Sequence, residues 1–98
     1  MKNISFGIAF LFSLNVIIAQ DAINSIQVET VRSHLYTLAS DEMEGRKAGT
    51  AGIEKAAQYI ENVFKTIGLS HYGNLTSFRQ NFTLNGLDLF NIIGVLEG

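Results

Sequence analysis

The chain has 98 residues, of which 47% are hydrophobic, a composition typical of one small globular domain or part of one. Its formal net charge of −2 is weakly acidic and lacks the basic excess expected of a nucleic-acid-binding protein. Because the sequence contains no cysteine, disulfides and a lipid-modified cysteine are both excluded.

Residues 1–19, MKNISFGIAFLFSLNVIIA, predict a signal peptide. Lys2 is followed by an apolar stretch that ends in the small residue Ala19, just before polar residues. The alternative is a membrane anchor, but a spanning helix needs about 20 predominantly apolar residues. Ser13 and Asn15 interrupt this run, and no cluster of Lys or Arg follows it. We therefore expect export to the periplasm or the extracellular space, with no membrane attachment after cleavage.

The first element predicted in the mature part, residues 20–98, is a helix from Ser25 to Leu38. Its apolar positions recur at steps of three and four and share one face: Val28, Val31, Leu35 and Leu38. Ser25 is expected to be its N-cap, with Glu29 near the favourable N-terminal end.

A second helix is predicted from Ala51 to Ile67. Its apolar stripe comprises Ile53, Ala56, Ala57, Ile60, Val63, Phe64 and Ile67. Glu61 and Lys65 on the polar side have the spacing of an i,i+4 ion pair.

Both ends of this second helix carry stop signals. Thr50 is expected to cap the start. Gly68 suits the left-handed position after the last turn, and Leu69 is then expected to fold back on Phe64 as in a Schellman motif.

The period then changes to two. Side chains alternate between two faces of a predicted half-buried strand. The face expected to be buried carries Phe78, Gln80, Phe82 and Leu84, and the other carries the polar residues Arg79, Asn81 and Thr83. Asn85-Gly86 predicts a two-residue hairpin turn. The apolar run from Phe90 to Leu96 is typical of a strand covered on both faces. Two helices cannot cover both faces of such a sheet, so further strands, helices or another subunit are expected.

The residues alone indicate no catalytic or metal site. His34 and His71 are isolated, and the acidic group Asp41, Glu42 and Glu44 lacks the spacing of a calcium loop. No nucleophile motif or phosphate-binding loop is present.

The connection between the helices, SDEMEGRKAGT, is unusual. Gly45, Gly49 and Gly52 permit sharp turns and close backbone approach. Arg46 among them offers a rigid fork of donors. One interpretation is that Arg46 ties down carbonyls or a carboxylate of the loop, and the other is that it shapes the edge of a substrate cleft.

The stretch LASDEMEGRKAGTAGIEKAAQYIENVFKTIGL, followed by QNFTL and NIIGVLEG, resembles the start of a known family. It is similar to the secreted zinc aminopeptidases of peptidase family M-twenty-eight, the relatives of aminopeptidase Y and bacterial leucyl aminopeptidase. The resemblance runs from about Leu35 to Gly98 and departs at Ala51, where relatives often carry proline.

The resemblance implies an α/β/α fold around a mixed sheet, of which this chain supplies an incomplete N-terminal part, two helices plus a β-hairpin. It also implies two zinc ions that activate a bridging water for hydrolysis of N-terminal peptide bonds. No residue here can be matched to a zinc ligand or to the catalytic glutamate. We therefore expect an inactive N-terminal fragment, truncated before the metal ligands, whose partners are a peptide substrate and the missing C-terminal part of the domain.

Two other classes stay open. One is a small exported binding or interaction protein that is complete as it stands. The other is a membrane-anchored envelope protein, which requires that residues 1–19 are retained.

Overall fold

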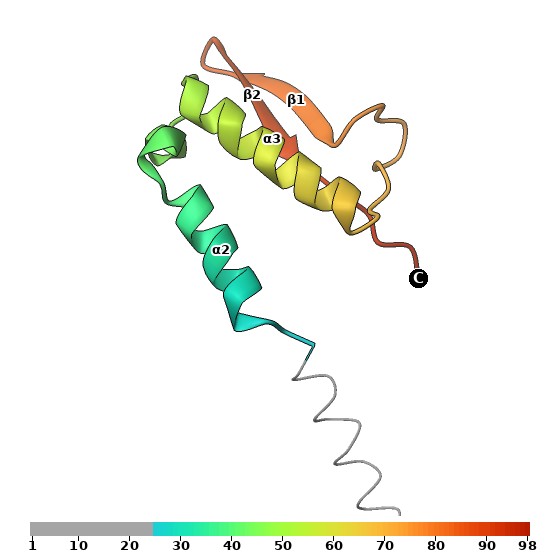
Figure 1. Cartoon of the computed structure of the whole chain (residues 1–98). Helices are drawn as coiled ribbons and strands as arrows, with labels where there is room; N and C mark the ends of the chain where they lie inside the picture. Colours follow the sequence, from blue (N-terminus) through green and yellow to red (C-terminus); the bar gives the residue numbers. More distant parts are fainter. Residues whose placement is uncertain (1–24) are drawn as a thin grey trace, which may run out of the picture. The chain divides into compact units, whose positions relative to one another are not determined.

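The computed structural model describes residues 25–98, which form helices and a two-stranded antiparallel sheet (Figure 1). In chain order the elements are α2 (Val28–Leu38), the 3-10 helix η1 (Asp41–Arg46), α3 (Ala51–Thr66), β1 (Arg79–Leu84) and β2 (Leu87–Ile92). This is the predicted mixture of helices and a hairpin. The predicted signal peptide, residues 1–19, lies outside the described residues. Among the residues described, no helix is both long and apolar enough to cross a membrane.

The chain divides into two compact units, Met1–Leu35 and Tyr36–Gly98, and α2 spans the boundary. The expected N-cap at Ser25 is wrong, since α2 begins three residues later. The amide of Val31 donates the first helical hydrogen bond to the carbonyl of Gln27, at 3.1 Å, so Gln27 occupies the position that Ser25 was expected to hold. Glu29 lies in the first turn, where its charge favours the helix.

Helix α3 has both of the predicted end signals. The Thr50 hydroxyl accepts a hydrogen bond from the amide of Ile53 at 3.4 Å. At the other end, the amide of Leu69 donates to the carbonyl of Phe64 at 3.0 Å and that of Gly68 to Lys65 at 3.1 Å. This pair of bonds, with Gly68 at φ 79°, defines a Schellman motif.

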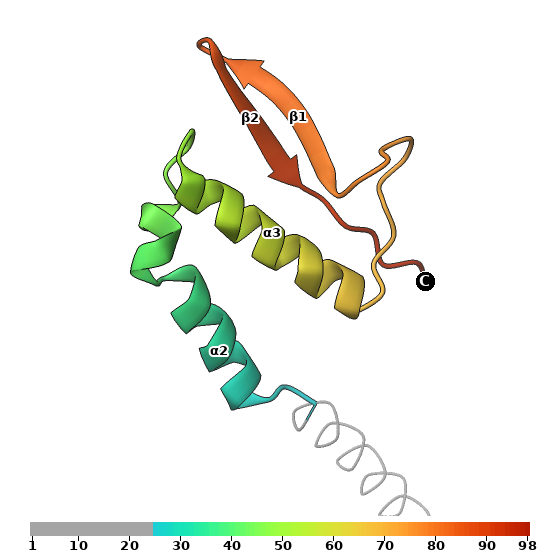
Figure 2. The ribbon, with the colours of Figure 1, turned by 45° about the horizontal axis from the view of Figure 1, so that its top comes forward.

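The hairpin turns at Asn85-Gly86, as predicted. Both residues have positive φ, 51° and 76°, which is the backbone of a type I′ turn. The register pairs Leu84 with Leu87 and Arg79 with Ile92. Figures 1 and 2 show the two strands running alongside α3, with the turn near the start of the helix.

The predicted second strand, Phe90 to Leu96, is misplaced. The tight turn starts β2 at Leu87, and β2 ends at Ile92 because its partner begins at Arg79. One further bond joins the Ile93 amide to the Phe78 carbonyl at 2.8 Å. Beyond it, Val95 exchanges two hydrogen bonds with Ser70, both at 2.9 Å, which ties the chain after β2 to the end of α3.

The predicted burial of β1 is also only partly right. Phe78, just before the strand, is 3% exposed, but Phe82 and Leu84 are 41% and 56% exposed. Arg79, expected on the polar side, is the strand residue turned toward α3. Among the described residues, the apolar side chains of β1 are therefore largely exposed, as is expected of a strand that packs against a further element.

The core of the unit Tyr36–Gly98 is small. Its buried hydrophobic side chains are Met43 from η1, Ala56 and Ala57 from α3, and Phe78. The Phe78 ring makes edge-to-face contacts with Phe64, at 5.5 Å between centroids, and with His71, at 4.6 Å. These contacts fix the connection between α3 and β1, and so place the hairpin beside the helix.

Candidate functional site

The end of η1 and the connection from it to α3 contain an unusual run of left-handed backbone. Glu44, Gly45 and Arg46 have φ of 47°, 64° and 57°, and Gly49 follows at 80°. Left-handed backbone is costly for residues with a side chain, so the run persists only because its surroundings hold it. Gly45 and Gly49 meet the expectation that glycines make the sharp turns of this loop.

Arg46 is held by a backbone carbonyl. Its guanidinium, through one terminal nitrogen, donates a hydrogen bond to the carbonyl oxygen of Leu38 at the end of α2. This agrees with the first interpretation of Arg46, in which it ties down the loop. The side chain nevertheless stays exposed at the rim of a pocket.

Glu44 caps the start of α3. Its Oε2 accepts a hydrogen bond from the amide of Gly52 at 2.6 Å. A carboxylate at this end of a helix satisfies a free amide and complements the helix dipole. The sequence analysis did not predict this bond. The signal for it was only an acidic residue, Glu44, eight positions before a glycine in the first turn of the predicted helix.

Gly52 is required by a close approach. A Cβ at this buried position would lie 2.3 Å from the carbonyl oxygen of Met43 and 2.6 Å from Cβ of Glu44. No side chain fits between those atoms, and the nearest is backbone, which cannot swing aside. The backbone of η1 therefore packs directly on the first turn of α3, as predicted for this glycine.

A pocket of about 180 Å³, here called the loop pocket, lies between this connection and the hairpin. Arg46, Gly49 and Ile53 line it on one side. Phe82, Asp88, Leu89 and Phe90 line it on the hairpin side. Its lining residues are mostly apolar and include one basic residue, Arg46, and one acidic residue, Asp88.

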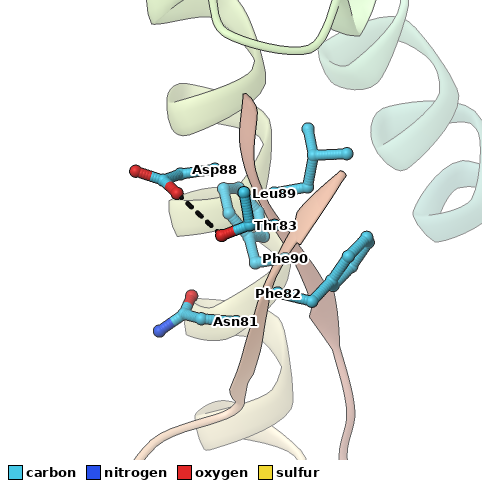
Figure 3. A pocket seen from close by; sticks show the side chains of 6 residues that line it. All are labelled: Asn81, Phe82, Thr83, Asp88, Leu89 and Phe90. Carbon is cyan, nitrogen blue, oxygen red and sulfur yellow. Dashed lines mark hydrogen bonds between the residues drawn. The ribbon is translucent and has the colours of Figure 1, made fainter. Parts of the chain in front are cut away.

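A second, larger hollow of about 380 Å³ lies over the hairpin itself and shares Phe82, Asp88, Leu89 and Phe90 with the loop pocket. Figure 3 shows Asp88 and Asn81 projecting to one side of the strands and Phe82 to the other. Oδ1 of Asp88 accepts a hydrogen bond from the hydroxyl of Thr83 at 3.1 Å (Figure 3). That bond holds the Asp88 carboxylate on its own face of the hairpin.

Arg79 joins the hairpin to α3 through two carboxylates, and we call this group the Arg79 clamp. Its Nη1 and Nη2 donate to the two oxygens of Glu54 at 2.8 and 2.7 Å. Its Nε and Nη2 donate to the two oxygens of Glu61 at 2.7 and 3.2 Å. The guanidinium also lies 4.7 Å from the centroid of the Phe90 ring.

The charges of the Arg79 clamp stabilise one another. Hydrogen bonding to Arg79 lowers the pKa of the Glu54 carboxyl from its ordinary 4.5, although partial burial opposes the shift. Hydrogen bonds to Glu54 and Glu61 raise the pKa of Arg79 further above its ordinary value. Glu54 is 45% exposed, so water screens much of its interaction.

The Arg79 clamp replaces a predicted ion pair. Glu61 pairs with Arg79 rather than with Lys65, because bidentate contact with a guanidinium is favoured over a lysine on the same helix. The spacing of seven between Glu54 and Glu61, which sets both on one helix face, was a signal for such a partner. It did not identify Arg79, since that depends on where the hairpin packs.

No residues fit a zinc site in the part of the chain that is described. Among residues 25–98, no three His, Cys, Asp or Glu side chains lie close enough together to hold a metal ion. The donors that a two-zinc centre needs are thus not assembled by these residues, and no chemical step can be assigned to a metal here.

Comparisons with protein-family models, curated proteins and solved structures found no match to the chain.

Proposed function

We propose that the chain is the N-terminal segment of an exported zinc aminopeptidase. The observation that carries the proposal is the ordered series of motifs: the glycine-rich loop around Arg46, the helix that ends in Gly68-Leu69, the QNFTL strand and the NIIGVLEG segment. Their resemblance to secreted zinc aminopeptidases extends over nearly all of the mature chain. Residues 1–19 would direct export.

The geometry of the described residues is compatible with this role. The hairpin leaves Phe82, Leu84 and Leu87 exposed, which suits two strands of a larger sheet. The connection that carries Arg46 lies at the same end of α3 as the hairpin turn (Figure 2). In the proposed enzyme it would edge the substrate cleft, with Arg46 shaping the cleft rather than taking part in the chemistry.

The ligands of the zinc ions and the catalytic glutamate would be supplied by a segment that these residues do not include. A two-zinc centre of that kind would supply an activated water for hydrolysis of the N-terminal peptide bond. The residues in hand would contribute a scaffold only, through the packing of η1 on α3 and the Arg79 clamp. The 98-residue chain by itself is therefore expected to be inactive.

Two measurements test the proposal. The coding DNA is read past the Gly98 codon, where a continuing frame, or one restored by a single shift, is expected to encode a histidine and an aspartate soon after. The purified chain is also assayed with zinc on aminoacyl-p-nitroanilides, and no turnover is expected. Reproducible turnover that a chelator abolishes would refute the fragment interpretation.

The second candidate is a small exported binding protein, and the loop pocket favours it. Within the unit Tyr36–Gly98, the Schellman motif, the Arg79 clamp and the Ser70–Val95 bridge tie α3 to the hairpin. A single cooperative thermal transition from a monomeric chain would support this candidate. Broad, non-cooperative melting or concentration-dependent association would count against it.

A further inference from the structure

We propose that Asn85 is a site of spontaneous covalent modification, at which the side-chain amide is lost as ammonia and the backbone rearranges to isoaspartate. The only reactants are the chain itself and water, so the reaction needs no enzyme and no metal. The proposal does not depend on the aminopeptidase assignment, because it concerns only the turn between β1 and β2.

The reaction joins two neighbouring groups, the side chain of Asn85 and the backbone amide of Gly86. The Gly86 nitrogen loses its proton to hydroxide and attacks Cγ of Asn85. A bond forms between these two atoms, the bond from Cγ to the side-chain nitrogen breaks, and that nitrogen takes up a proton and leaves as ammonia. Water then opens the resulting succinimide at one of its two carbonyls, which gives either aspartate or isoaspartate.

Neither reacting group is held by another part of the described chain. Within residues 25–98, the Gly86 amide donates no hydrogen bond and the Asn85 side chain makes none. Both residues are exposed, at the tip of the hairpin (Figure 2). Because Gly86 has no side chain, its nitrogen is unshielded and its backbone can rotate. Water therefore reaches the site, and no interaction within the described residues has to break at either group.

The turn has to open before the ring can close. In a type I′ turn the first central residue is left-handed, as Asn85 is at φ 51°, and the following nitrogen points away from its side chain. The pair that closes the hairpin is Leu84 and Leu87, whose side chains are 56% and 52% exposed. Little burial opposes fraying at this end, so a local opening gives the reactive arrangement while α3 stays folded.

The other asparagines of the described chain provide internal comparisons: Asn62, Asn74, Asn81 and Asn91. Three of them lie inside α3, β1 or β2, where regular structure holds the backbone. Asn74 is the closest match to Asn85, since it is exposed in a loop, but Leu75 follows it. The Leu75 amide donates to the carbonyl of Tyr72 at 3.0 Å, and its side chain crowds the nitrogen. Asn85 is therefore expected to react first among these residues.

Isoaspartate would disrupt the hairpin. It routes the main chain through the former side chain and so lengthens the backbone between β1 and β2. A type I′ turn holds two residues of ordinary length, so the pairing of Leu84 with Leu87 would be lost. Among the described residues the sheet consists of these two strands alone, and the neighbouring pair of Phe82 and Leu89 would weaken in turn. The modification would thus loosen the hairpin progressively as the molecule ages.

The test is a time course on the purified full chain at pH 8, followed by peptide mapping with mass spectrometry. Asn85 is expected to convert at least about tenfold faster than Asn74, which corresponds to a barrier about 1.4 kcal/mol lower. Enzymatic methylation by an isoaspartyl methyltransferase is expected to label the product at the turn. The rate is expected to fall at pH 6, because the Gly86 nitrogen attacks only after it has lost its proton.

N85G is the matched variant, because Gly-Gly also forms a type I′ turn but carries no side-chain amide. It is expected to form no isoaspartate at the turn, whereas N74Q is expected to leave the conversion of Asn85 unchanged. NMR of the aged wild-type chain is expected to show that the cross-strand contacts between Leu84 and Leu87 are lost. The N85G chain, aged in the same way, is expected to keep them.

Two results would overturn the proposal. Conversion of Asn85 no faster than that of Asn74 would remove the site. Aged wild-type chain that carries isoaspartate at the turn and still keeps the contacts between Leu84 and Leu87 would remove its effect. If N85G fails to fold, the comparison of Asn85 with Asn74 within the wild-type chain still decides. None of these results bears on the aminopeptidase proposal, which rests on turnover and on the reading frame.

Discussion

The guanidinium of Arg79 holds the carboxylate of Glu54 through two hydrogen bonds of 2.8 and 2.7 Å, and so links the first residue of β1 to the first turn of α3. The same guanidinium binds Glu61 and lies over Phe90. A cation shared by two carboxylates and an aromatic ring is held in one position, since each partner limits the freedom of the others. The attachment of the hairpin therefore depends strongly on this one side chain.

Arg79→Met tests the Arg79 clamp, because methionine keeps an apolar stem near Phe90 but donates no hydrogen bonds. We expect a loss of about 1–2 kcal/mol in the free energy of unfolding, measured by urea denaturation followed by circular dichroism. Arg32→Met is the control, since Arg32 forms an exposed pair with Glu29 at 3.3 Å. That control is expected to cost no more than about 0.5 kcal/mol. Equal losses in the two variants would contradict the role of Arg79.

The Arg79 clamp also makes stability depend on pH. Because the folded-state pKa of Glu54 is below its ordinary 4.5, its stabilising contribution is complete above that value and is lost as the pH falls through the lowered pKa. We expect the free energy of unfolding to decrease between pH 6 and pH 3, and less steeply in Glu54→Gln. Glu97→Gln, the same change at an exposed site, should keep the wild-type slope. A wild-type slope in Glu54→Gln would show that other groups cause the dependence.

Gly52→Ala tests the contact between η1 and α3. The new Cβ would meet the Met43 carbonyl oxygen at 2.3 Å, so the two backbones must separate. We expect a loss of about 1–3 kcal/mol in thermal or urea unfolding. Gly98→Ala, where a Cβ meets nothing within 4 Å, should leave stability unchanged. A harmless Gly52→Ala would mean that this packing is looser than described.

Gly94→Ala gives a milder substitution for comparison with Gly52→Ala. A Cβ added at Gly94 would lie 2.7 Å from Cδ1 of Leu69 and 2.9 Å from Cδ2 of Phe64, both in side chains. Side chains can adjust where backbone cannot, so Gly94→Ala should cost less than Gly52→Ala. The reverse order would show that the segment after β2 is the tighter of the two contacts.

The exposed face of the hairpin gives a fifth test. Leu84→Thr and Leu87→Thr are expected to change the stability of the 98-residue chain by no more than about 0.5 kcal/mol, because both side chains are exposed. Phe78→Ala removes a buried ring and should cost about 3 kcal/mol or more. If the proposed larger enzyme is obtained, the two leucine substitutions are expected to destabilise it. An unchanged larger enzyme would argue that its remaining strands and helices do not cover this face.

Local signals in the sequence predicted the local structure well. Thr50, Gly68 and Asn85-Gly86 each act through their own backbone and nearest neighbours, so the ends of α3 and the hairpin turn follow from short stretches of residues. The start of α2 was misjudged because Ser25 is only one of several residues able to lie before a helix. Helix ends are the least certain part of any such prediction.

The contacts between elements could not be predicted in the same way. The apolar run from Phe90 to Leu96 indicated a strand, but the hairpin register ended it at Ile92. Arg79 belonged to the polar side of its strand, and only the packing on α3 gives it two carboxylates. The loop pocket depends likewise on the approach of Asp88 to the Arg46 loop, which no spacing along the chain encodes.

The reciprocal bonds between Ser70 and Val95 have a practical consequence. They bring the outgoing polypeptide back to the corner where α3 ends, far along the helix from the hairpin turn (Figure 1). A reporter or affinity tag joined to Gly98 would therefore emerge at that corner. It would leave both the loop pocket and the uncovered hairpin surface accessible to probes.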